Sequence, residues 1–240
     1  MDDEKLLQAT QTGEVVQPIR LYYQLVDKKQ LLYRFKRLRC MDFDRVNNRW
    51  VWLYSHESKV LKFVKSYSSI PKVMHPIVIG SFFLRSGDEL LFLDLRSFDR
   101  AIQAIPFFDK HIGRAVARIT HAAAVNRFFD AKEQFPPNLD GFFCSDEMIE
   151  INPDNSIAEI ESLIETHRID GKPDWSSVFE QEAKKALPEI EKFPVHFYEE
   201  GIDSIKTTLR MRQIMASQHW KGNTDYTLFD VVKTAISGKR

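Results

Sequence analysis

The sequence is poor in cysteine, and it has no apolar run long enough to cross a membrane. Its 240 residues include two cysteines, Cys40 and Cys144. A disulfide scaffold needs more, so we expect reduced thiols in a cytosolic protein. The longest apolar clusters, such as residues 90–95, are strand-sized, whereas a membrane span needs roughly 18 apolar residues. The polar, acidic start of the chain is unlike a secretory or transit peptide. We therefore expect a cytoplasmic location and no membrane span.

Sequence motifs for well-known chemistry are missing as well. The nine glycines are scattered and form neither GxGxxG nor GxxxxGK[ST], so dinucleotide and P-loop phosphate cradles are not supported. The seven histidines show no HxH, HxxxH or HExxH spacing, which argues against structural zinc. No serine lies in a GxSxG context. The sequence therefore predicts no cofactor and no resident metal.

Apolar residues are abundant enough for a substantial core. Hydrophobic residues make up 43% of the chain and include eighteen phenylalanines. This composition excludes global disorder. The length allows one large domain, or one domain of about 150 residues with a smaller appendage.

Charge is balanced over the whole chain but not along it. Residues 17–66 contain twelve Lys/Arg and four Asp/Glu, a net charge of +8. Residues 138–203 contain five bases and seventeen acids, a net charge of −12, and the tail from residue 204 returns to +5. Such a split predicts either a charged partner or docking between the two regions.

The sequence predicts an α+β fold: an antiparallel sheet of four to five strands with helices on one face, followed by an acidic helical C-terminal region. The clearest hairpin joins residues 39–44 and 49–54, which alternate with period two around a loop at 45–48. A second hairpin is predicted from residues 77–84 and 89–95. Ser97 is predicted to cap a helix that ends or bends at Pro106.

Other segments leave alternatives open. Residues 19–38 carry apolar residues at helical spacing, which favours an amphipathic helix over two short strands turning at 27–29. Residues 114–129 favour a strand that passes into a helix. We expect further helices from Ser156, from Asp174 or Ser176, at 202–219 and at 227–236.

The expected organisation has three parts. Residues 1–17 are polar and are expected to form a mobile N-terminal arm. Residues 18–135 form the α+β core domain, and residues 138–240 form a mainly helical region packed on the core or appended to it. The boundary is placed at the Phe-Pro-Pro-Asn segment, residues 135–138, which is rigid and turn-forming.

Three acidic residues form the candidate catalytic set. Asp42 and Asp44 share one face of a predicted strand, and Asp94 lies near the end of another. Convergence of the three would create an oxygen-rich site for a divalent cation, as in enzymes that cleave phosphate esters. The order of elements is compatible with an RNase H-like sheet, which is an analogy of topology alone. The other interpretation is a surface ion pair between Asp44 and Arg49.

A basic segment is the candidate binding surface. Residues 33–39 interleave bases with aromatic residues, a pattern that suits nucleic acid, since cations neutralise phosphates and exposed rings stack on bases. An ordinary amphipathic helix with a solvated basic face explains the same pattern. The sequence favours a non-catalytic binding or assembly protein over the metal-dependent enzyme. Its partner would be a protein or an anionic polymer, and self-association through the complementary charged regions is a further possibility. The expected contact residues are Lys28, Lys29, Arg34, Lys36, Arg37 and Arg39.

Overall fold

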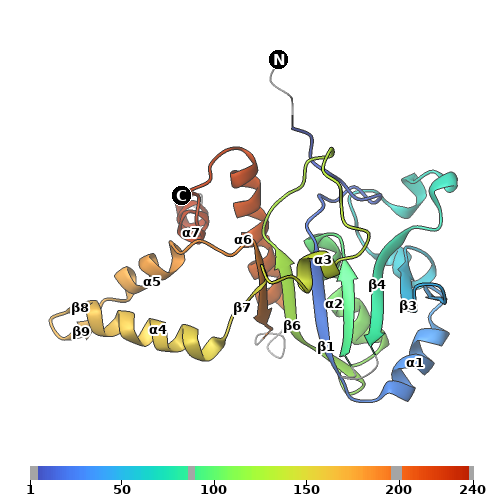
Figure 1. Cartoon of the computed structure of the whole chain (residues 1–240), viewed down its shortest axis with the longest axis horizontal. Coiled ribbons are helices and arrows are strands. Elements are labelled where there is room, and N and C mark those ends of the chain that lie inside the picture. The colour runs from blue at the N-terminus through green and yellow to red at the C-terminus, as the bar shows by residue number, and fades with distance from the viewer. Residues whose placement is uncertain (1–4, 86–89, 196–201, 238–240) are drawn as a thin grey trace.

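An eight-stranded mixed sheet organises the chain in the computed structural model, which describes residues 5–85, 90–195 and 202–237 (Figure 1). The strand order is β2-β3-β4-β5-β1-β6-β10-β7. All neighbours pair antiparallel except β10 and β7, which are parallel. The strand bounds are Ile19–Leu25 (β1), Met41–Asp44 (β2), Arg49–Leu53 (β3), Val78–Arg85 (β4), Leu90–Leu95 (β5), Ala117–Val125 (β6), Ile149–Glu150 (β7) and Ile190–Pro194 (β10). The α+β class is confirmed, and the prediction of four to five strands is wrong because distant segments join the sheet.

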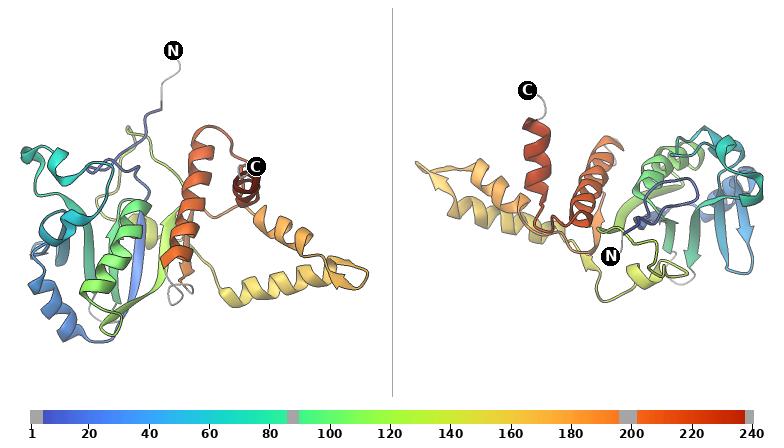
Figure 2. Two further views of the ribbon diagram at one scale, coloured as in Figure 1. Left: turned by 180° about the vertical axis from the view of Figure 1, so that it is seen from behind. Right: turned by 90° about the horizontal axis from the view of Figure 1, so that it is seen from above.

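The helices lie on both faces of this sheet and beyond its β7 end (Figures 1 and 2). In the described part of the chain they are Lys28–Arg37 (α1), Phe98–His111 (α2), Asp140–Phe143 (α3), Pro153–Thr166 (α4), Trp175–Ala183 (α5), Ile202–Trp220 (α6) and Leu228–Ser237 (α7). Three short 3-10 helices at His56–Val60, Tyr67–Ser69 and Lys72–Met74 connect β3 to β4. A separate two-stranded ribbon of Arg168–Ile169 (β8) and Lys172–Pro173 (β9) joins α4 to α5.

Both predicted hairpins are present. Asp44 pairs with Arg49 across a four-residue loop, and Trp52 pairs with Met41. β4 pairs with β5 in the second hairpin, whose predicted turn residues 86–88 lie outside the described residues. Period-two alternation therefore identified the first hairpin, and the turn signal between two apolar segments identified the second.

The interpretation of residues 19–38 as one helix is wrong in its first half. This half is β1, a central strand with Leu21 and Tyr23 buried, and helix α1 begins only after Asp27. Asp27 caps α1 by accepting a hydrogen bond from the backbone N–H of Gln30. Pairing with both β5 and β6 outweighed the local helical spacing, because a central strand satisfies its backbone groups on both sides.

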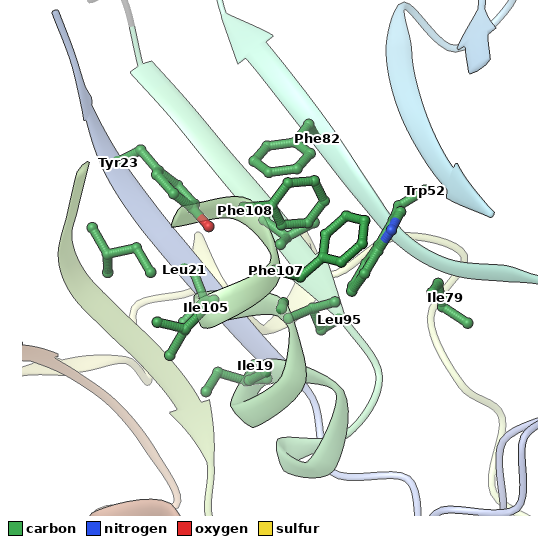
Figure 3. Packing of buried hydrophobic residues seen from close by; sticks show 14 of the residues in the cluster. Ile19, Leu21, Tyr23, Trp52, Ile79, Phe82, Leu95, Ile105, Phe107 and Phe108 are labelled. Atoms are coloured by element: carbon green, nitrogen blue, oxygen red, sulfur yellow. The ribbon is translucent and has the colours of Figure 1, made fainter. Parts of the chain in front are cut away.

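The main core lies between one face of the sheet and helices α1, α2 and α6, and we call this face the core face. Trp52 is fully buried, with ring centroids 5.2 Å from Phe107 and 4.7 Å from Phe108 (Figure 3). The Ser97 cap is confirmed, and the predicted end of the helix at Pro106 is wrong, since α2 continues to His111. Proline costs a helix one hydrogen bond, and the buried aromatic residues that follow it offset this cost through packing.

The opposite face of the sheet, which we call the outer face, is covered only in part. Residues 126–148 cross it and bring α3 over β1 and β6 (Figure 1). Phe129, Leu139 and Phe143 form a second apolar cluster there with Ala123 of β6. The helix expected after β6 is absent, because Ala122, Ala123 and Ala124 are fully buried strand residues.

The acidic region contributes both to the sheet and to a projecting arm. Strand β10 pairs with β6, and α6 packs against α2. Between β7 and β10, helices α4 and α5 extend away from the sheet; we call residues 153–183 the acidic arm (Figure 2). Helix α4 starts at Pro153 with Asn152 as its cap, three residues before the predicted start at Ser156. Asp174 caps α5 as predicted.

The segment expected to be a mobile arm is described from Lys5 onward. In this part Thr12, Glu14 and Gln17 are buried. The Glu14 carboxylate accepts hydrogen bonds from the hydroxyls of Thr10 and Thr12 and from Arg100 of α2. This polar cluster fastens the N-terminal segment to the first turn of α2.

Candidate functional site

Helix α1 presents the predicted basic residues to solvent. Lys28, Lys29, Lys36 and Arg37 are exposed, and so is Arg39, which follows the helix. Helix α1 contains no acidic residue. At 3.6 residues per turn, Lys28, Lys29 and Lys36 project within about 100° of one another. Arg37 projects about 180° from Lys28, so the cations spread over half of the helix circumference. We call these five exposed side chains together the α1 basic surface.

The sixth predicted contact residue has a structural partner. Arg34 is half-buried and donates a hydrogen bond to the carbonyl of Ile112, which ends α2. Gly113 follows with a φ of +80°, a left-handed conformation that favours glycine at a helix end. Arg34 therefore joins α1 to α2, and its side chain is less free than the others to meet a partner.

One aromatic ring accompanies the α1 basic surface. Tyr33 is 54% exposed, and the Arg37 guanidinium lies 5.5 Å from its ring centroid and donates a hydrogen bond to its hydroxyl. Phe35 is buried against Trp50 and Phe82. The α1 basic surface thus offers cations with a single exposed ring.

The oppositely charged regions lie at opposite ends of the molecule. Helix α1 borders the β2 edge of the sheet, and the acidic arm extends beyond the β7 edge (Figure 1). Within the described ranges, no ion pair joins residues 28–39 to residues 138–203. The ion pairs of the arm are local, such as those of its Glu159 and Glu182 with Lys185, which follows the arm. The α1 basic surface is therefore open to solvent in this arrangement.

The three candidate acids share the outer face but do not converge. Register places Asp42 opposite Val51, Val51 opposite Ser81 and Ser81 opposite Asp94. Three strand spacings of about 4.8 Å therefore separate Asp42 from Asp94, about 14 Å in all. Asp44 pairs with Arg49 at 3.0 Å, which was the other interpretation of this carboxylate. No group of three potential ligand side chains close enough to hold a metal ion occurs among the described residues.

Asp94 belongs instead to a buried arginine network that the sequence did not reveal. Arg20 is 2% exposed and donates to both oxygens of Asp94, at 2.6 and 2.9 Å, and to Asp140 at 2.8 Å. Arg85 also donates to Asp140. Burial alone lowers the pKa of Arg20, but the two carboxylates outweigh it and raise that pKa. The partners are 74 and 120 residues apart, so no local pattern could have identified them.

A pocket of about 470 Å³ opens beside this network, and we call it the end pocket. Its walls are residues 8–11 of the N-terminal segment, the start of β4, the end of β5 and residues 135–139. Arg49, Arg96 and Arg100 line it together with Asp94. Sequence reasoning missed the end pocket because its walls come from several segments that are far apart in the sequence.

Comparison with known proteins adds no family to these observations. None of the helices in the described residues is long and apolar enough to cross a membrane. No family model matches the chain, and no curated protein or solved structure is significantly similar to it.

Proposed function

We propose that this protein is a non-catalytic binding or assembly protein that engages an extended array of negative charges through the α1 basic surface. The array is either an anionic polymer such as a nucleic acid or an acidic surface of a protein. One observation carries the proposal: five exposed cations on and beside a ten-residue helix that contains no acid.

The fold supports this function by holding α1 rigidly while leaving its cations free. Leu31 and Phe35 anchor the helix in the core, and Arg34 ties it to the end of α2. A fixed helix presents its charges in one arrangement, which limits the side-chain and backbone ordering that binding requires. The exposed Tyr33 adds a ring on which a base or another planar group can stack.

A second copy of the chain is a possible partner through the acidic arm. The arm is too far from α1 to neutralise it within one molecule in this arrangement, but an arm from another molecule can reach it. Trp175 and Phe179 of the arm are 61% and 50% exposed, so a contact there would also bury apolar area. Self-association and polymer binding would then compete for the α1 basic surface.

The proposal is tested by measuring the binding of labelled single-stranded DNA, duplex DNA and heparin as a function of salt. If all five cations contact phosphates, log Kobs for single strands should fall with log salt at a slope of about −3.5. Between 50 and 200 mM salt, this slope means a loss of about 100-fold in affinity. Lys36→Glu/Arg37→Glu should abolish binding and leave the Tm nearly unchanged, since both side chains are exposed.

The matched control is Lys172→Glu/Lys221→Glu, which makes the same change in charge at exposed positions away from α1. This control should bind nearly as well as the unmodified protein. Equal losses in both double variants would mean that net charge alone governs binding. Absence of binding to all three polymers at 50 mM salt would contradict the polymer form of the proposal. The other form of the proposal, binding to an acidic protein surface, would then require that Lys36→Glu/Arg37→Glu loses a protein partner or self-association while the control variant keeps it.

A further inference from the structure

The end pocket lies on a different part of the molecule from the α1 basic surface. Helix α1 packs on the core face through Phe35, whereas Asp94 and its neighbour Ser81 face outward at the floor of the end pocket. A ligand in the end pocket would therefore leave α1 uncovered. The end pocket needs an explanation of its own.

The charges around the end pocket leave one cation unpaired. Arg49 pairs with Asp44 and Arg100 with Glu14, while Asp94 is held by Arg20. Arg96 has no ion pair among the described residues. The Arg96 side chain is exposed in part, and its partial desolvation and the charge of Arg49 both lower its pKa. The two guanidinium groups therefore repel each other. An anion beside them would relieve this repulsion.

Arg96 is also oriented for such a contact. Its guanidinium lies 4.9 Å from the ring centroid of Phe135, a cation–π arrangement that limits its rotation. Arg49 is fixed by Asp44 at 3.0 Å and by the hydroxyl of Ser81 at 3.3 Å. Arginine is well suited to phosphate because its planar group presents several donors at once.

The remaining lining indicates an organic group attached to the anion. The volume of about 470 Å³ lies in the usual range for small-molecule sites and far exceeds what a bare phosphate needs. Phe83, Phe135, Pro136 and Pro137 supply apolar walls for a ring. Gln8 adds a polar side chain to the lining of the same space.

We propose that the end pocket binds a ring-containing organic phosphate of about nucleotide size. Arg96 and Arg49 hold the phosphate, and Phe135 packs on the ring. The cluster of Glu14 and Arg100 keeps residues 8–11 in place as one wall. This site is independent of the polymer-binding function proposed for α1.

Thermal unfolding with adenosine monophosphate, adenosine or inorganic phosphate, at constant ionic strength, tests the proposal. At about ten times its Kd, adenosine monophosphate should raise the Tm of the full chain by about 3–5 °C. Adenosine and inorganic phosphate should each bind more weakly. Arg96→Ala should raise the Kd for adenosine monophosphate at least tenfold, and Phe135→Ala should weaken it while affecting inorganic phosphate less.

Arg168→Ala is the matched control, because it removes one exposed arginine from the acidic arm; its Kd should equal that of the unmodified protein. The proposal would be overturned if none of the four nucleotides, adenosine, guanosine, cytidine and uridine monophosphate, raised the Tm at 10 mM. It would also be overturned if Arg96→Ala bound normally, or if inorganic phosphate stabilised as strongly as the nucleotides. Loss of the nucleotide response in Lys36→Glu/Arg37→Glu would assign that response to α1 instead.

Discussion

Replacing Glu14 with glutamine should destabilise the protein strongly, although Glu14 lies in the polar N-terminal segment. Its carboxylate is the acidic partner of Arg100, and their side chains are 1% and 3% exposed. Arg100 would keep only neutral acceptors, namely the Thr12 hydroxyl at 2.7 Å and two carbonyls at 3.4 Å. Burial already lowers the pKa of Arg100 to about 10 despite the opposing effect of Glu14. An arginine side chain stays charged in proteins, and leaving a buried charge uncompensated costs about 3–5 kcal/mol.

Urea unfolding followed by tryptophan fluorescence measures this loss. The midpoint should fall without a change in the m-value, provided that unfolding stays two-state. Glu14→Leu/Arg100→Met should be less destabilised than the sum of its single variants, since it removes both charges together. A matched pair nearer the surface is Asp44 and Arg49, where Asp44→Asn should cost much less than Glu14→Gln. A cost below about 1 kcal/mol for Glu14→Gln would refute the reasoning and leave the N-terminal segment energetically detached from α2.

Three further outcomes are expected. Trp52→Ala should lower the unfolding free energy measured in urea by about 3–5 kcal/mol, because it empties a fully buried site. Trp175→Ala, at a position 61% exposed, should lower it by less than about 1 kcal/mol. Similar losses in the two variants would contradict the placement of Trp52 in the core. The charges and hydrogen bonds of Arg20 and Arg85 outweigh burial and lower the pKa of Asp140. The ionised carboxylate of Asp140 therefore stabilises the fold above its unfolded pKa of about 4, and this stabilisation is lost as pH falls below that value. Asp140→Asn should flatten the decline of the unfolding free energy below about pH 5, and an unchanged decline would contradict this role of Asp140. If copies associate through the acidic arm, sedimentation at 50 mM salt should show oligomers that dissociate at 300 mM salt. Asp154→Lys/Glu161→Lys should weaken these oligomers. Monomers at both salt concentrations would rule out association through the arm.

Local signals in the sequence identified the elements that local physics determines. The first hairpin follows from period-two alternation and the second from its turn signal. Ser97 caps α2 as predicted, and Asp174, one of the two predicted starts, caps α5. Near the C-terminus, Asp230 accepts hydrogen bonds from the backbone and hydroxyl of Thr227 at the start of α7, which was predicted at 227–236. Each of these features needs only residues within a few positions of one another.

The errors arose where distant partners decide the conformation. The apolar spacing around Leu21 fits a helix as well as a strand, and only β5 and β6 on either side make it a strand. The alanines at 122–124 favour helix by propensity, yet they are buried between β1 and β10. The strand count failed for the same reason, since β10 pairs with β6 across more than 60 residues of sequence.

The candidate sites also differ in whether their residues are close together in the sequence. The α1 basic surface is local, so its exposed cations could be chosen from the sequence, apart from the tertiary bond of Arg34. The network around Arg20 and the end pocket around Arg96 both require segments that meet only after folding. Neither Arg20 nor Arg96 could be singled out from the sequence, because a lone arginine in a strand or just after one has no local neighbours that mark it.

The separation of charge between α1 and the acidic arm follows from what stabilises the fold. Exposed ion pairs contribute about 0–1 kcal/mol each, whereas burying a single large apolar side chain contributes about 1.5–3 kcal/mol. Phe35 therefore determines where α1 docks, and the positions of its lysines follow from that docking. The fold gains little by bringing the acidic arm across the molecule to meet them. Charges left unpaired in this way are available to a partner, and the salt dependence of binding is the property that tests this directly.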